Sequence, residues 1–175
     1  MFTFNAVRLV AAGVLLAAPA LAQETTYGFG RPAASAEIAR LDTDVRFDGK
    51  GLPPGNGTVP EGKALYEERC ASCHGADLKG IKEAGARGFI GPGMTVQNHW
   101  PHAPTLFDYI RRAMPFTEPA SLDSKQVYAL TAYILSVAGI VPKDTVMDAA
   151  TLSAVQMPNR DGFTSDPRPD IPAHP

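Results

Sequence analysis

The spacing of apolar positions is typical of an amphipathic helix in the last third of the chain. Between Asp123 and Gly139, side chains that suit a buried face recur at intervals of three and four residues. They are Val127, Leu130, Thr131, Ile134, Leu135 and Ala138. Asp123 and Gln126 have the spacing of a capping box, and Gly139 and Pro142 are residues that end helices. We therefore predict a helix between Asp123 and Gly139.

Two further helices are predicted earlier in the chain. One begins at Pro60, where a proline followed by a glutamate suits the first helical turn. The other spans residues 104–113 and ends before Pro115, because the residue that precedes a proline disfavours helical geometry. Its apolar side chains gather on one side, and they are Leu106, Phe107 and Ile110.

The rest of the chain is dominated by glycine and proline. Six of the nine positions from 49 to 57 are Gly or Pro, so we expect residues 23–59 to form an extended arm. Residues 75–101 contain six glycines and are expected to be loop-like, and residues 141–175 form a Pro-rich C-terminal arm. No segment shows the alternation of a strand. The predicted fold is all-α, with a domain over residues 60–140 between two long irregular arms.

The first 22 residues have the features of a secretory signal peptide. Arg8 precedes an apolar stretch over residues 9–18, and Ala20-Leu21-Ala22 offers the small-residue pattern at which such peptides are cleaved. The stretch is shorter than the roughly 20 residues of a membrane span, although an uncleaved anchor is the alternative. We expect export, cleavage before Gln23 and a soluble periplasmic protein.

Composition excludes several classes of protein. The chain has 175 residues, 19% of them charged, with a formal net charge of −2, which excludes an acidic disordered protein and a basic nucleic-acid binder. The length allows one ordinary domain. With only two cysteines, the chain is not a disulfide-rich scaffold. The purpose of the two cysteines is therefore the main chemical question.

Both cysteines belong to the sequence Cys70-Ala71-Ser72-Cys73-His74, the C-x-x-C-H pattern of covalent haem attachment. Thiols three residues apart on a helical turn can reach the two vinyl groups of a haem, and the adjacent imidazole can bind the iron. A zinc site would need further Cys or His ligands at suitable spacing, and a thioredoxin-like motif would need a βαβ context. Neither is present, so we predict one covalent haem c with its iron.

The chain resembles the class I c-type cytochromes. Gly62 lies eight residues and Tyr66 four residues before Cys70, as in the N-terminal helix of that family. Leu130 and Tyr133 occupy the matching positions of the family's C-terminal helix. The resemblance implies the class I cytochrome c fold, a small helical bundle around one haem, in which these two helices cross.

The resemblance also implies that a methionine between the last two helices is the sixth iron ligand. Met114, followed by Pro115, lies there, and His74 would be the fifth ligand. The alternatives for the sixth position are Met94, Met147, Met157, His99 and His102. A thioether ligand would favour Fe(II) and would leave the iron without an open coordination position. Such a site suits single-electron transfer more than substrate chemistry.

Four further residues are expected at the haem. In Gly91-Pro92, the resemblance implies that the carbonyl of Pro92 accepts the N–H of the proximal imidazole. Trp100 could donate to a haem propionate or be a core residue, and Tyr109 could pack on the porphyrin or the core. Arg111, with its neighbour Arg112, could pair with propionates or with an acidic partner, or lie on a solvated helix face.

A narrower resemblance covers nearly the whole chain after residue 22. It is to the cytochrome subunit of periplasmic sulfite and sulfane dehydrogenases of the Sox type. The similar segments are YGFGRPA (27–33), LDTDVRFDGKGLPPGNG (41–57), NHWPHAPTLFDYIRRAMPF (98–116), YALTAYILSVAGIVP (128–142) and MPNRDGF (157–163). Those cytochromes often carry a second C-x-x-C-H, which is absent here, so the resemblance implies a monohaem variant. His99 and His102 stand where tyrosines are expected.

This resemblance implies an electron-transfer subunit that is not catalytic alone. It would accept electrons singly from a molybdenum-cofactor dehydrogenase subunit and pass them to a downstream cytochrome or oxidase. The alternatives are a general shuttle for another periplasmic dehydrogenase and a haem enzyme with a labile sixth ligand, such as a peroxidase or thiosulfate dehydrogenase. Because the arms exceed what a freely diffusing carrier needs, we expect them to dock along the partner.

Overall fold

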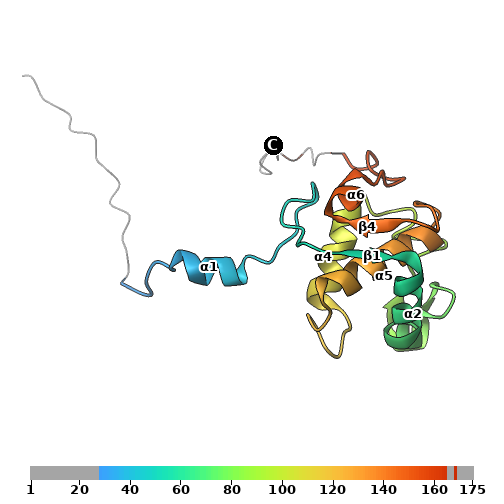
Figure 1. Cartoon of the computed structure of the whole chain (residues 1–175), viewed down its shortest axis with the longest axis horizontal. Coiled ribbons are helices and arrows are strands. Elements are labelled where there is room, and N and C mark those ends of the chain that lie inside the picture. Colours follow the sequence, from blue (N-terminus) through green and yellow to red (C-terminus); the bar gives the residue numbers. More distant parts are fainter. Residues whose placement is uncertain (1–27, 165–167, 169–175) are drawn as a thin grey trace, which may run out of the picture.

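The computed structural model describes residues 28–164 and 168, and its centre is the crossing of two helices. Helix α2 (Val59–Arg69) crosses α5 (Ser124–Val137), as expected, and Gly62 lies at the contact (Figure 1). A Cβ atom on Gly62 would lie 1.9 Å from the carbonyl oxygen of Ala129. The rings of Tyr66 and Tyr133 pack beside it, with centroids 5.4 Å apart. Glycine therefore permits the close approach of the two backbones.

Helix α4 (Ala103–Ala113) packs against α5 and completes the helical core. Its buried apolar side chains include the three expected from the sequence, Leu106, Phe107 and Ile110. The predicted capping box of α5 is confirmed, because the Asp123 carboxylate accepts a hydrogen bond from the backbone N–H of Gln126 at 2.9 Å. Within the described residues, no helix has the length and apolar character to cross a membrane.

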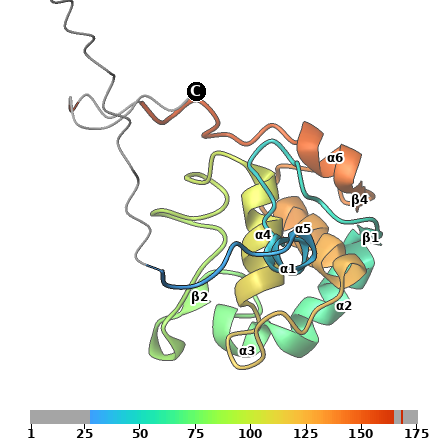
Figure 2. The ribbon, with the colours of Figure 1, turned by 90° about the vertical axis from the view of Figure 1, so that its left-hand side faces the viewer.

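The expectation that no strand forms is wrong. Strand β1 (Asn56–Thr58) pairs antiparallel with β4 (Val146–Asp148), and the two lie side by side in Figure 2. Strand β2 (Gly80–Ile81) pairs with β3 (Ala86–Arg87) around the short 3-10 helix η1 (Lys82–Ala84). Strands of two or three residues are too short to leave an alternating pattern. The fold is therefore mostly helical with two small sheets.

The segment after residue 140 is not irregular throughout, which corrects a second expectation. Met147 of β4 is fully buried, and the following helix α6 (Ala149–Ala154) buries Leu152. The helix begins because the side chain of Asp148 accepts a hydrogen bond from the N–H of Thr151 at 2.8 Å. Residues 165–167 and 169–175, where most of the tail's prolines lie, are outside the described residues.

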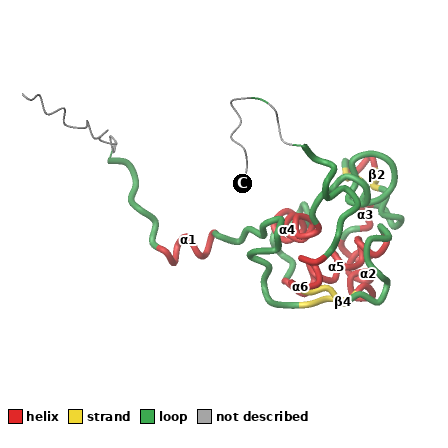
Figure 3. The backbone as a smooth tube through the Cα atoms, turned by 90° about the horizontal axis from the view of Figure 1, so that it is seen from above, coloured by secondary structure: helices red, strands yellow, loops and turns green. Residues whose placement is uncertain are grey.

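The N-terminal arm divides into an exposed helix and a packed loop. Helix α1 (Ser35–Leu41) buries no residue and lies apart from the body of the molecule, as Figures 1 and 3 show. The expectation that Gly and Pro exclude helix from the arm is therefore wrong here, because the glycines and prolines cluster after this segment. The loop that follows packs on the body, where Val45 is buried. Residues 1–27, including the predicted signal peptide, lie outside the described residues.

Candidate haem site

The C-x-x-C-H sequence forms a tight turn at the end of α2. Cys70 terminates α2, and the short helix α3 (Ala71–His74) follows at once. The N–H groups of Cys73 and His74 both donate to the carbonyl of Cys70, at 3.1 and 2.9 Å. Cys70 is half-buried and Cys73 is exposed. Burial raises the pKa of the Cys70 thiol to about 11, so its surroundings favour a neutral sulfur, which a thioether is.

The imidazole of His74 is held in place on one side. Its Nδ1 lies 2.9 Å from the carbonyl oxygen of Arg87, and because a carbonyl can only accept, Nδ1 carries the proton. The ring of Phe89 packs against the imidazole with centroids 4.6 Å apart. Tyr66 supports the same turn by donating to the carbonyl of Gly75 at 2.8 Å. This arrangement leaves Nε2 of His74 as the nitrogen that can bind a metal.

The acceptor for His74 differs from the one expected. The sequence resemblance assigned that role to the carbonyl of Pro92, whereas the structure gives it to Arg87. The difference arises because the β2–β3 hairpin carries Arg87 next to α3, while Pro92 follows the hairpin and is exposed. Pro92 instead lines a neighbouring cavity.

Two glycines allow the hairpin to close tightly. A Cβ atom on Gly80 would lie 2.6 Å from the carbonyl oxygen of Ala86, and one on Gly88 would lie 2.5 Å from the backbone of Lys79. Gly80 also has a φ of 85°, a left-handed conformation that favours glycine. The glycines that predicted a loop in this region thus form the hairpin that supports the histidine.

The structure narrows the candidates for the sixth ligand. Met147 and Met157 are packed in the core, with exposed fractions of 0% and 4%, and are core fillers. Met94 is 60% exposed. Met114 is half-buried, directly after the last turn of α4 and at the edge of the core. Met114 therefore has both the position expected of the sixth ligand and a partly exposed side chain.

The two histidines proposed as alternative ligands make contacts elsewhere. The ring of His99 packs edge-on against Phe163, with centroids 5.3 Å apart, and its carbonyl accepts a hydrogen bond from Asn159. The ring of His102 packs against Phe47 at 5.0 Å. Both histidines are thus covered by residues from the two terminal segments of the described chain.

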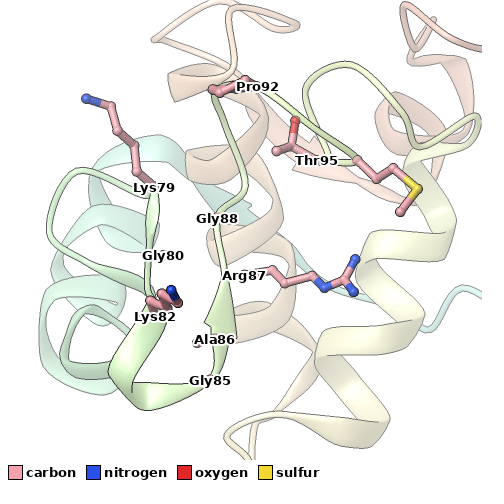
Figure 4. A pocket seen from close by; sticks show the side chains of 10 residues that line it. Lys79, Gly80, Lys82, Gly85, Ala86, Arg87, Gly88, Pro92 and Thr95 are labelled. Carbon is pink, nitrogen blue, oxygen red and sulfur yellow. The ribbon is translucent and has the colours of Figure 1, made fainter.

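A cavity of about 420 Å³ lies beside the hairpin, and its lining is basic (Figure 4). Lys79, Lys82 and Arg87 contribute to it together with Pro92 and Thr95. Figure 4 shows the side chain of Arg87 extending from β3 toward α4, whereas that of Lys79 points away. Among residues 28–164 and 168, the guanidinium of Arg87 has no hydrogen-bond or ion-pair partner. Sequence analysis did not single out Arg87.

The other expected site residues are placed as follows. Trp100 is half-buried and meets the ring of Tyr109 edge-on at 6.1 Å, while Tyr109 itself is half-exposed. The guanidinium of Arg111 donates to the carbonyl of Thr43 at 3.1 Å. Arg111 is therefore engaged with the N-terminal segment, as is Arg112 through Asp44. The haem contacts of Trp100, Tyr109 and Arg111 stay predictions.

The residues present fit a haem. A set of apolar side chains from α3, the 89–100 segment and the end of α4 packs on the core but is only partly covered. They include Cys70, Ala71, Phe89, Ile90, Trp100 and Met114. In the described part of the chain, no three His, Cys, Asp or Glu side chains gather in a way that could hold a metal ion. The alternative of a structural zinc site thus has no ligand set there.

Comparison with known proteins gives one family match and two curated relatives. The model of the family "Cytochrome C oxidase, cbb3-type, subunit III" matches residues 57–134. The cbb3-type cytochrome c oxidase subunit CcoP of Azospirillum sp. (strain B510) is 29% identical in an alignment of 103 residues that covers 55% of this chain and 34% of that protein. The thiosulfate dehydrogenase of Stutzerimonas stutzeri (strain A1501) is 30% identical in an alignment of 90 residues that covers 48% of this chain and 29% of the enzyme. The chain thus matches about a third of each relative's length.

A solved structure matches over a larger part of the chain. In the crystal structure of the sulfane dehydrogenase SoxCD from Paracoccus pantotrophus, one chain is 37% identical and superposes with a TM-score of 0.73. The match covers 81% of this chain and 73% of the SoxCD chain. The similarity therefore extends well beyond residues 57–134.

Proposed function

Because the chain belongs to the c-type cytochromes, in the group that includes the cytochrome subunit of sulfane dehydrogenase, we propose that it serves a periplasmic sulfur-oxidising dehydrogenase. In this role it accepts electrons one at a time from a molybdenum-cofactor subunit that oxidises sulfite or sulfane sulfur. It then passes them to a downstream cytochrome or oxidase. The observation that carries the proposal is the 37% identical match to a SoxCD chain over 81% of this chain.

The geometry around α3 supports a single haem c at this site. Cys70 and Cys73 would hold the haem through thioethers, and His74, oriented by the carbonyl of Arg87, would bind the iron. Met114 would occupy the sixth position. When bound, haem c supplies a one-electron Fe(III)/Fe(II) couple. A His/Met pair leaves no open position for a substrate and favours the reduced iron, which suits a carrier of electrons.

The basic cavity supports the same assignment. Haem propionates are anionic, and a guanidinium without a partner is suited to pair with them. Arg87 has such a guanidinium within the described residues, and its side chain extends toward α4 (Figure 4). We propose that Arg87 pairs with a propionate in place of Arg111, whose guanidinium donates to the carbonyl of Thr43, and that Trp100 is a second donor.

The proposed partner contact lies along the N-terminal arm. Helix α1 buries no residue on the body of the molecule, although Ile38 and Leu41 are apolar and exposed. The family model begins only at residue 57, whereas the SoxCD match covers 81% of the chain. We infer that the arm is a docking element for the molybdenum subunit, and that residues 1–22 direct export to the periplasm.

Purification of the native protein tests this function. The preparation is assayed for molybdenum, for a copurifying subunit and for reduction of the haem on addition of sulfite or a persulfide-bearing protein. We expect a molybdenum-containing partner and sulfur-dependent reduction. A haem that stays oxidised with each sulfur substrate, in a preparation without molybdenum, would contradict the proposal.

A further inference from the structure

The last turn of α4 is attached to residues 43–45 by a group of polar contacts, of which the one between Asp108 and Val45 is buried. Asp108 is 7% exposed although it carries a carboxylate. Its Oδ1 accepts a hydrogen bond from the backbone N–H of Val45 at 3.0 Å. Nε of Arg112 lies 3.0 Å from both carboxylate oxygens. Asp108 thus joins the N-terminal segment to the end of its own helix.

Two more contacts reinforce this junction. Nη1 of Arg112 lies 3.3 Å from Oδ1 of Asp44, and the guanidinium of Arg111 donates to the carbonyl of Thr43 at 3.1 Å. Hydrogen bonds in which one partner is charged are stronger than neutral ones. We call Thr43, Asp44, Val45, Asp108, Arg111 and Arg112 the α4 clamp.

The loop over residues 45–53, which α4 contacts through the clamp, is itself packed on the body. Gly51 has a φ of 92°, and a Cβ atom there would lie 2.3 Å from the carbonyl oxygen of Asp44, so the loop folds back closely on the clamp. Val45 is 6% exposed and belongs to the core. Further along, the hydroxyl of Tyr128 on α5 donates to the carbonyl of Pro53 at 2.8 Å. The clamp therefore ties α4 to a fixed point on the body.

Met114 follows directly on the clamped turn. Its N–H donates to the carbonyl of Ile110 at 3.1 Å, which makes it the C-terminal cap of α4. A shift of the backbone at Arg111 and Arg112 would consequently move Met114. We propose that the α4 clamp positions Met114 and so strengthens the bond between its sulfur and the haem iron. This inference rests on the proposed ligand role of Met114.

A purely structural role for the clamp makes a different prediction. In that case, loss of Asp108 would lower the free energy of unfolding without changing how easily the folded protein exchanges its sixth ligand. A positioning role requires that the exchange become easier in the folded state. Binding of imidazole to the ferric haem measures this exchange, because imidazole must displace Met114.

The test compares imidazole affinity in the holoprotein and its variants. In Asp108→Asn, we expect imidazole to bind about threefold to tenfold more tightly, with a weaker iron–sulfur charge-transfer band in the ferric spectrum. Arg111→Gln removes only the contact with Thr43 and should change the affinity in the same direction by less. Asp48→Asn is the matched control, because Asp48 lies in the same loop but outside the clamp.

The outcomes separate this inference from the function on which it rests. Imidazole affinities within about twofold of the unmodified protein in both clamp variants would overturn the positioning role, whatever the change in urea stability. If Asp108→Asn does not fold, Arg111→Gln decides. Met114→Ala should raise the affinity most. An unchanged affinity in Met114→Ala would instead overturn the ligand assignment, and the clamp proposal with it, without touching the partner assignment.

Discussion

Arg87 brings two different groups to the haem site. Its backbone carbonyl orients His74, and its side chain extends from β3 toward α4 beside a cavity lined by other basic residues (Figure 4). The two groups can be separated by mutation, because a substitution changes the side chain and leaves the carbonyl. The charge of this residue can therefore be tested without removing the support of the histidine.

We predict that Arg87→Gln lowers the reduction potential of the haem. A nearby positive charge disfavours the ferric state, which carries one more positive charge than the ferrous state. At an effective dielectric constant of about 20, two unit charges about 15 Å apart interact by about 1 kcal/mol, which is on the order of 50 mV for one electron. Potentiometric titration of the holoprotein measures the shift.

Lys63→Gln serves as the control for Arg87, because Lys63 is an exposed residue of α2 paired with Glu67. Its loss should leave the potential nearly unchanged, since Lys63 lies outside the basic cavity and its charge is already paired with that of Glu67. Equal potentials in Arg87→Gln and the unmodified protein would show that the guanidinium does not face the haem.

The side chains of the C-x-x-C-H motif can be proposed as haem ligands from the sequence, whereas the backbone contact that supports His74 cannot. Cys70, Cys73 and His74 are predicted from the sequence because their spacing suits the chemistry of attachment. The carbonyl of Arg87 has no sequence signature, since every residue carries one. Pro92 was chosen for that role by resemblance, and the hairpin that displaces it was not foreseen.

At the scale of elements, the contact between α2 and α5 leaves no room for a side chain at Gly62. A Cβ atom on Gly62 would meet Ala129 O at 1.9 Å and the Cβ of Tyr133 at 2.8 Å. Both neighbours belong to α5, so the two helices would have to separate. The C-x-x-C-H turn follows α2 directly, and a displaced α2 would also move the haem attachment.

Gly62→Ala should therefore lower the free energy of unfolding by about 3 kcal/mol, the upper range for overpacking a well-packed contact. Urea unfolding of the holoprotein, followed by far-UV circular dichroism, measures the change. Lys63→Ala on the exposed side of the same helix is the control and should stay within about 0.5 kcal/mol of the unmodified protein. Similar values for the two variants would contradict the close approach.

Two of the three helices expected from the sequence carry a repeating apolar pattern, whereas α2 is indicated by the proline and glutamate at its start. Helices α4 and α5 each repeat their apolar face over several turns, and α5 also has its capping box. Strands β1 and β4 are three residues each and come from distant parts of the chain. Their pairing is a tertiary effect that no local pattern encodes. Helix α6 has a local signal in the cap at Asp148, but its six residues are too few to show a repeating apolar face.

At the scale of the whole molecule, the two terminal segments behave differently. The C-terminal segment returns to the body, where β4 pairs with β1 and Asn159 donates to the carbonyl of His99. The N-terminal segment is attached to the body from the α4 clamp onward, whereas α1, which precedes the clamp in the sequence, lies away from the body (Figure 1). The Gly and Pro content predicted two similar arms. It does not indicate which apolar residues pack in the core, and several of the C-terminal segment do whereas those of α1 do not.

Helix α1 exposes apolar residues that a partner could cover. It has seven residues, and helices much shorter than about 12 residues are marginal in water without tertiary packing. Leu41 is 83% exposed, Ile38 is 54% exposed, and Phe29, just before the helix, is 93% exposed. If the molybdenum subunit covers Ile38 and Leu41, each contributes about 1.5 kcal/mol or more to the complex through burial.

The double variant Ile38→Ser/Leu41→Ser should thus weaken binding to the molybdenum subunit on the order of a hundredfold, which corresponds to about 3 kcal/mol. The haem spectrum and the urea stability should not change, because neither side chain touches the core. Val146→Ser, at an exposed apolar position of β4, is the control and should bind normally. Titration of the copurified partner with each variant measures the affinities. Equal affinities for all three proteins would place the docking surface elsewhere than on α1.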